Sequence, residues 1–193
     1  MMNSEGPELA SGIRAGDPEA QRMAVEAYLP QILRASRAAG LDGATAEDVA
    51  QSTFLTFFEK AATFEGRSKV RTWLFGILYR KIQEARRKGR REMPTDEIEA
   101  IVDRRFDERG NWANPPQDIE RVLEGAEVRE AIDGCLEDVP TQQRMAFVLR
   151  EVEGLISEEI CKILSVTRTN LGVLIFRARN RLRECLEARG MSR

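Results

Sequence analysis

The chain has 193 residues, 42% of them apolar and 32% charged, which is enough to bury a core and too polar for a membrane protein. No apolar run approaches the roughly 20 residues of a membrane-spanning helix, and the first residues lack a signal-peptide pattern, so we expect a cytoplasmic protein without membrane insertion. The absence of histidine excludes Ser/His/Asp and Cys/His catalysis and every metal site built on imidazole.

The three cysteines, Cys135, Cys161 and Cys185, are odd in number and contain no C-x-x-C pair. We therefore expect neither a disulfide framework nor a zinc site, and we place all three in apolar packing. The chain also has no P-loop, dinucleotide fingerprint or G-x-S-x-G motif. These features argue against an enzyme, and no cofactor is expected.

Charge is segregated along the chain, although the formal net charge is only -2. Residues 60–91 contain 11 basic and 2 acidic side chains, residues 92–138 contain 5 basic and 15 acidic ones, and residues 168–193 contain 7 basic and 2 acidic ones. Two basic blocks separated by an acidic spacer predict two surfaces that bind polyanions. The alternative is that charged helices simply alternate in sign on solvated faces.

Helical periodicity without any strand-like alternation predicts an all-α fold. Residues 1–16 are mostly small and polar and are expected to be disordered. A first helix is expected to begin with Asp17 as its N-cap and Pro18 at its first position, and to end at the glycines of 40–43. A second helix is expected to begin at Thr45, which an acidic residue follows three positions later.

The next helix begins near Val70, after a loop at 65–68, and ends in the very basic segment 86–91. Phe75 and Tyr79 lie off its apolar stripe and among arginines. Aromatic rings between cations suit the stacking of single-stranded bases, at about 1–3 kcal/mol per base. Packing inside the protein fits these two rings equally well.

The segment 93–117 has the composition of a linker, and a second helical block follows at 118–188. In this block Ser157 is the expected N-cap of a short helix, and a tight turn leads to a longer helix from Arg168. These are the proportions of a helix-turn-helix, whose second helix enters the major groove of DNA. A plain amphipathic hairpin is the alternative. The face opposite the buried stripe would present Thr169, Val173, Phe176 and Asn180.

At this point the motifs resemble a known family. The stretch AEDVAQSTFL at 46–55, with FEG at 64–66 and RTWLFGI at 71–77, is similar to region 2 of bacterial sigma factors. Similarity to region 4 comes from three segments, LREVEGL at 149–155, EEI at 158–160 and FRARNRLR at 176–183. Two short helical domains in this order resemble the extracytoplasmic-function (ECF) group of the sigma-70 family.

The resemblance implies a subunit that gives RNA polymerase its promoter specificity, reading the −35 element as duplex and capturing the melted −10 element as a single strand. Region 2 would span 17–92, and region 4 would span 118–188. The acidic linker at 93–117 would thread the RNA-exit path. The implied partners are core RNA polymerase (the β′ clamp helices and the β flap), promoter DNA and an anti-sigma factor.

Three groups of residues are assigned by position from this resemblance. Core polymerase would be bound by Asp48, Gln51, Ser52 and Phe54. The −10 element would meet a loop that takes a flipped base, Glu65, Gly66, Arg67, Ser68 and Lys69, and a helix carrying Arg71, Tyr79, Arg80, Glu84, Arg87 and Lys88. The −35 element would meet Arg168, Thr169, Asn170, Val173, Phe176 and Arg177.

The sequence departs from the family at several of these positions. Arg80 stands where asparagine is usual, Glu84 stands where aspartate is usual, and Gly172 with Val173 replaces residues that are commonly polar or basic. These departures leave the promoter sequence open. Because the acidic linker offsets the basic blocks, we also expect the free chain to bind duplex DNA weakly.

Two other functions remain open. A stand-alone helix-turn-helix regulator would bind a palindrome as a dimer, but it leaves the 46–55 motif without a role. An all-α adaptor or sigma mimic would sequester a partner, such as an anti-sigma factor, without touching DNA. The altered DNA-contact positions keep this second alternative open.

Overall fold

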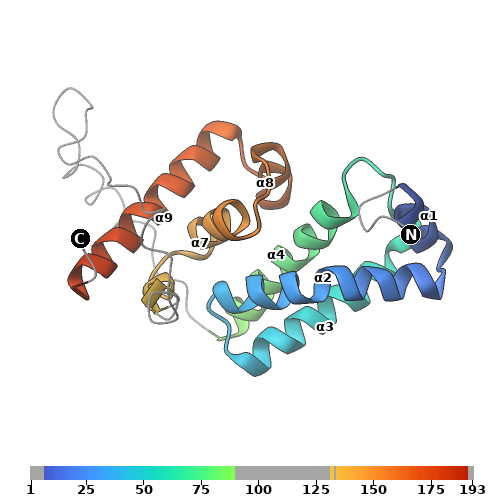
Figure 1. Ribbon diagram of the computed structural model, residues 1–193, viewed down its shortest axis with the longest axis horizontal. Coiled ribbons are helices and arrows are strands. Elements are labelled where there is room, and N and C mark those ends of the chain that lie inside the picture. Colours follow the sequence, from blue (N-terminus) through green and yellow to red (C-terminus); the bar gives the residue numbers. More distant parts are fainter. Residues whose placement is uncertain (1–6, 90–130, 133, 191–193) are drawn as a thin grey trace.

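The computed structural model describes residues 7–89, 131–132 and 134–190, and within these ranges every regular element is helical. The expected all-α fold is thereby confirmed for the described part of the chain; the predicted linker at 93–117 lies outside it. Figure 1 shows two groups of helices side by side, α1 to α4 and α7 to α9. Their bounds are α1 Pro7–Ala15, α2 Pro18–Ala38, α3 Gly43–Glu59, η1 Ala61–Thr63, α4 Val70–Gly89, α7 Thr141–Phe147, the π-helical turn η4 Val148–Val152, α8 Ser157–Leu164 and α9 Arg168–Ala188.

The N-terminal helix α1 shows that the expected disorder of residues 1–16 is wrong for residues 7–15. Leu9 and Ile13 lie four residues apart on one face of α1, and both are fully buried where α1 packs against α2 and η1. Two large apolar residues among small polar ones make too short a stripe to be recognised without the partner that covers them. Residues 1–6 lie outside the described ranges.

Acidic side chains cap the N-termini of α2 and α3. The expected N-cap Asp17 is confirmed, since its carboxylate accepts the N–H of Glu19 at 3.1 Å. The expected start of α3 at Thr45 is wrong, because Asp42 is the N-cap. Its carboxylate accepts the N–H of Thr45 at 2.9 Å and the Thr45 hydroxyl at 2.8 Å, so α3 begins two residues earlier than predicted.

Aromatic rings form much of the core between α3 and α4. The ring of Trp73 lies 4.9 Å from that of Phe57 and is stacked 4.8 Å from that of Phe64. Phe75 and Tyr79, predicted off the apolar stripe, are buried with 0% and 5% exposure. The physical reason is that α4 packs against α2 and α3 and also against α8, so a single stripe underestimates its buried surface.

The second group of helices packs α7 and α8 against α9. The predicted buried stripe of α9 comprises Leu171, Leu174, Ile175, Ala178 and Leu182. It is confirmed except at Ile175, which is partly buried. Asn180, predicted to face outward, is buried as well, because α9 is covered by two helices and its buried face is wider than one stripe.

The start of α8 also differs from the prediction. Ile156 is the N-cap, and its N–H is accepted by the carboxylate of Glu159. Ser157 is the first helical residue, and its hydroxyl accepts a hydrogen bond from Arg150. The N-cap prediction was therefore one residue too late in the chain.

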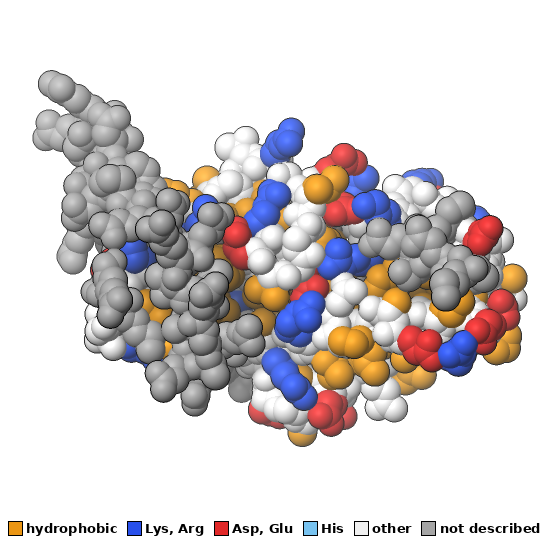
Figure 2. Space-filling view, viewed as in Figure 1, with side chains coloured by type: hydrophobic (Ala, Val, Ile, Leu, Met, Phe, Trp, Pro, Cys, Tyr) orange, Lys and Arg blue, Asp and Glu red, His pale blue; other side chains and the backbone are white. Residues whose placement is uncertain are grey.

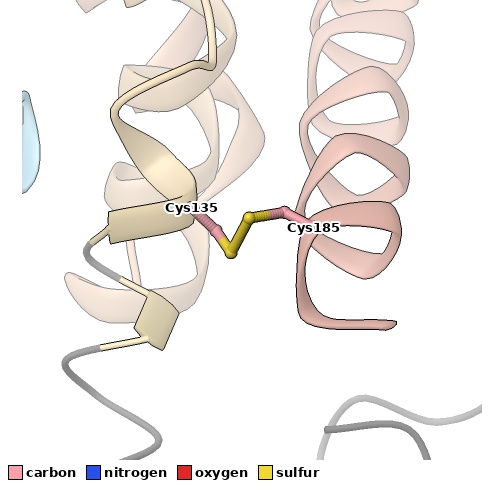
Figure 3. The surroundings of a disulfide bond; sticks show 2 residues. All are labelled: Cys135 and Cys185. Carbon is pink, nitrogen blue, oxygen red and sulfur yellow. A yellow bond between two sulfur atoms is a disulfide. The ribbon is translucent and has the colours of Figure 1, made fainter. Parts of the chain in front are cut away.

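A disulfide between Cys135 and Cys185 overturns the expectation that the cysteines are unpaired. The S–S distance is 2.07 Å and the Cα atoms lie 5.7 Å apart. Figure 3 shows the bond joining a helical turn that precedes α7 to the C-terminal part of α9. Fifty residues separate the pair, so no local spacing marks it in the sequence. Cys161 is free and partly buried.

Candidate nucleic-acid interface

An apolar groove of about 400 Å³ lies between α2 and α3. Of the residues assigned to core polymerase, Gln51 and Phe54 line it, whereas Asp48 is exposed and Ser52 is partly buried outside it. Figure 2 shows hydrophobic side chains reaching the surface among charged ones over these helices. The remaining lining residues are Val25, Leu29, Leu33, Glu47, Ala50, Leu55 and Phe58.

The groove has the shape and chemistry to receive the apolar face of a helix. Leu55 forms part of its wall and is 57% exposed, the most exposed large hydrophobic residue of the described chain. The sequence assignment missed Leu55, although an apolar residue outside the buried stripe of α3 was the available signal. Together, the exposed leucine and the apolar groove form a candidate binding surface.

The loop at 65–69, assigned to a flipped −10 base, is largely open to solvent. Gly66 has a φ of 73°, in the left-handed region that favours glycine. Arg67 is 85% exposed and pairs with Glu65 at 2.5 Å, a surface ion pair that contributes little to stability. Ser68 is partly buried, and Lys69 lies 3.0 Å from Glu159 of α8.

The assigned residues of α4 divide between two faces. Arg80, Glu84 and Arg87 are exposed and follow one another at helical spacing on the outer face. Arg71 lies nine residues before Arg80, about 180° around the helix, so the structure does not bring these two arginines together. Lys88 lies in α4, but its side chain is outside the described part.

Arg71 and Tyr79 are occupied by contacts within the protein. The guanidinium of Arg71 donates to the backbone carbonyl of Glu153 at 2.8 Å and lies 5.6 Å from the ring centroid of Phe75. Burial raises the pKa of the Tyr79 hydroxyl, and a hydrogen bond with Gln83 opposes this shift. The Tyr79 ring is therefore packed in the core and is not presented to a base.

The start of α9 presents the residues assigned to the −35 element. The tight turn before it contains Ser165 in the left-handed conformation, with a φ of 56°, and the hydroxyl of Thr167 caps α9 by accepting the N–H of Asn170 at 3.2 Å. Val173 is 39% exposed one turn later. The first turn of α9 exposes Arg168, Thr169 and Asn170. Further along the helix, Phe176 and Arg177 are partly buried.

Glu153 is the polar residue that the sequence assignment missed altogether. Its side chain has 0% exposure and ion-pairs with Arg34 at 2.8 Å and with Arg71 at 3.3 Å. A glutamate in a segment of mixed charge is typical of a solvated surface, and its partners lie 119 and 82 residues away, so nothing local could reveal the burial.

The described ranges lack two further features. No helix among those residues is long and apolar enough to cross a bilayer. In the same ranges, acidic and cysteine side chains do not gather in threes as a metal site would require.

Comparison with protein families matches both halves of the chain. The model described as Sigma-70 region 2 matches residues 24–92, and the model described as Sigma-70, region 4 matches residues 129–182.

Curated relatives give the same picture. A probable RNA polymerase sigma factor of Haemophilus influenzae is 36% identical over 148 residues, which is 73% of this chain and 76% of that protein. The ECF RNA polymerase sigma-E factor of Salmonella typhimurium is 30% identical, covering 68% and 69% of the two chains. The RNA polymerase sigma-H factor of Pseudomonas aeruginosa is 27% identical, covering 97% and 96%.

Two solved structures share the fold. CnrH in complex with the cytosolic domain of CnrY has a TM-score of 0.68 at 21% identity, covering 96% of this chain and 99% of that one. The sigma factor RpoE in complex with the anti-sigma factor NepR from Bartonella quintana has a TM-score of 0.63 at 24% identity, covering 86% and 96%. At these identities the likeness concerns the fold alone.

Proposed function

The chain belongs to the ECF group of the sigma-70 family of RNA polymerase sigma factors, and we propose that it directs transcription initiation through the α2–α3 groove, the outer face of α4 with its preceding loop, and the start of α9. The observation that carries this proposal is the order of the two family regions on one chain whose helix-turn-helix leaves the first turn of its second helix exposed. In this role the chain is an initiation factor and performs no chemistry of its own.

The groove between α2 and α3 is the proposed docking site for the β′ clamp helices of core polymerase. Phe54 forms part of its apolar lining and Leu55 supplies an exposed anchor, while the carboxylates of Glu47 and Asp48 favour a partner with basic side chains nearby. The β flap is the proposed contact of the second half.

Promoter DNA is the proposed ligand of the other two surfaces. The loop at 65–69, with Arg80 and Arg87, would bind the separated −10 strand, because exposed cations contact phosphates and an open loop can receive an unstacked base. Arg168 and Asn170 at the start of α9 would reach base edges of the −35 duplex in the major groove.

The cellular setting follows from this role. Core polymerase and promoter DNA place the protein in the cytoplasm. We also propose an anti-sigma factor as a partner, supported by the solved structure of similar fold in which the sigma factor RpoE is in complex with the anti-sigma factor NepR.

Transcription with purified core polymerase, with and without the protein, on fragmented DNA from its own source tests the proposal. We expect discrete new transcripts that share upstream sequence. Co-purification with core polymerase without transcripts would favour the sigma mimic. Specific binding of a palindrome without polymerase would favour the stand-alone regulator.

Two substitutions separate the proposed surfaces. Leu55→Asp should weaken binding to a fragment containing only the β′ clamp helices at least tenfold, whereas Val152→Asp, at a valine of the second half that is 45% exposed, is the control and should not. Arg168→Ala should abolish transcription from −35-dependent promoters while core binding persists, with Arg189→Ala at the far end of α9 as its control. Equal effects of test and control variants would contradict these assignments.

A further inference from the structure

A buried glutamate joins the two halves of the molecule. The carboxylate of Glu153, in the loop between η4 and α8, has 0% exposure and accepts hydrogen bonds from Arg34 Nε at 2.8 Å and Arg34 Nη2 at 3.0 Å. Arg71 Nη2 lies 3.3 Å from the same carboxylate. Arg34 comes from α2 and Arg71 from α4, so one side chain of the second half bridges two helices of the first.

A buried carboxylate is stable only with such partners. Taking its charge out of water is costly, and the two-pronged hydrogen bonds of Arg34 together with the Arg71 guanidinium offset that cost. Removing one member leaves the others buried and poorly compensated. The contact therefore forms or breaks as a unit.

Two further contacts between the halves also join a cation of the first half to an oxygen of the second. Lys69 pairs with Glu159 of α8 at 3.0 Å, and Arg86 donates to the hydroxyl of Thr141. In every one of these contacts the first half supplies the cation and the second half the oxygen acceptor.

The fit between the halves is close at the end of α2. Gly40 lies against the fully buried Arg144 of α7, where a Cβ atom would collide with the guanidinium. Figure 1 accordingly shows α4 running toward α7 and α8, with no described segment between the two groups.

We propose that this contact is an autoinhibitory latch, in which Glu153 and Glu159 occupy two cations that would otherwise bind the −10 strand. The inference rests on the proposed function, because Lys69 belongs to the loop proposed to bind that strand, and Arg71, assigned to the −10 element by family resemblance, follows it in the first turn of α4. Carboxylate and phosphate oxygens compete for the same guanidinium and ammonium donors. Closure and single-strand binding therefore exclude each other at these two side chains, and the protein must open to read the −10 element.

The test uses the full-length protein and the Glu153→Gln variant, which keeps the shape of the side chain and removes its charge. Small-angle scattering measures the radius of gyration, and fluorescence anisotropy measures binding of a labelled single-stranded 12-nucleotide DNA of random sequence. We expect Glu153→Gln to increase the radius of gyration and to tighten DNA binding about tenfold. Circular dichroism checks that helicity is retained.

Glu151→Gln is the matched control. Glu151 lies two residues away in the chain, and its partner Arg179, at 2.7 Å, belongs to the same half. The variant therefore changes net charge equally without touching the contact between the halves. If both variants tighten DNA binding equally, net charge explains the effect and the latch is refuted.

Arg34→Gln approaches the latch from the other side. Arg34 is half exposed and is not assigned to DNA, so a gain in DNA binding on removing this positive charge could come only from opening. An unchanged radius of gyration in both Glu153→Gln and Arg34→Gln would overturn the proposal. Scattering needs no polymerase, so failure of the latch is distinguishable from failure of sigma activity, which the transcription assay reports.

Discussion

The two halves of this sigma factor are stabilised by different means. In the first half the rings of Phe57, Phe64 and Trp73 pack against one another, and Phe58 contacts both Phe54 and Phe57. The second half has a mainly aliphatic core, the Cys135–Cys185 disulfide and the buried Arg144. The half proposed to hold polymerase is therefore fixed by packing, whereas the half proposed to read duplex DNA depends on a covalent bond and on contacts with the first half.

The largest expected effect tests the aromatic core. Phe57 has 0% exposure, and Phe57→Ala should cost about 3–5 kcal/mol of unfolding free energy, because burial of a ring is lost and a cavity remains. Chemical denaturation gives the total, and hydrogen exchange by mass spectrometry should localise the loss to α2, α3 and α4. Leu55→Ala, at an exposed site, should change stability by less than about 0.5 kcal/mol. Equal losses of hydrogen-exchange protection in the two halves would contradict the view that this ring stabilises the first half specifically.

The disulfide should carry the next largest effect. Reduction should lower the stability of the second half by about 2–4 kcal/mol, since the unfolded chain is released from a loop of 50 residues. Hydrogen exchange with and without a thiol reductant measures the change in stability of each half separately. The double variant Cys135→Ala with Cys185→Ala should lose the response to reductant, while Cys161→Ala should retain it. A loss of stability on reduction that is confined to the first half would contradict the assignment of the disulfide's effect to the second half.

A smaller effect is expected at the start of α9. Thr167→Ala removes the hydroxyl that accepts the N–H of Asn170 and should cost about 1 kcal/mol. Thermal unfolding of the two proteins is the measurement. Thr169→Ala, at an exposed position that caps nothing, is the comparison variant. A loss at Thr169 as large as that at Thr167 would show that capping is not the cause.

The smallest expected effect is a pH dependence of stability that the cap of α3 in the first half should show and the cap of α9 in the second half should not. Hydrogen bonds from the backbone N–H and then the hydroxyl of Thr45 hold the pKa of Asp42 below its ordinary value of 3.8. Its contribution to stability is therefore complete above pH 3.8 and is lost as the pH falls through the lowered pKa of the folded state. Asp42→Asn should make the unfolding of the first half less dependent on pH below 4. Thr167 does not ionise, so the cap of α9 should show no such dependence.

The sequence predicted those parts of the molecule whose cause is local. The Asp17 cap, the glycine break after α2, the tight turn at 165–167 and the buried stripe of α9 each follow from side chains within a few residues of one another. The two basic blocks are visible in the sequence because a run of cations needs no partner to be recognised, and their binding of polyanions stays a prediction.

Apart from the two misplaced helix starts, at α3 and α8, the failures have distant causes. Leu9 and Ile13 needed α2 and η1 to cover them, and Tyr79 is buried by helices on two sides of α4. Cys135 needed a cysteine 50 residues away, and the partners of Glu153 are more distant still. Periodicity assumes one buried face per helix, so it fails where a second half of the molecule covers the other face.

The disulfide also determines how the chain responds to pulling. Cys135 and Cys185 enclose α7, η4, α8 and nearly all of α9, so the oxidised chain cannot extend across about 170 Å of contour length when force is applied to its ends. The helix-turn-helix therefore lies in a segment that transmits no tension. A motor that unfolds proteins by threading them through a pore would meet the loop closed by this disulfide. It would have to pass two segments of the polypeptide at once, or wait until a reductant opens the loop.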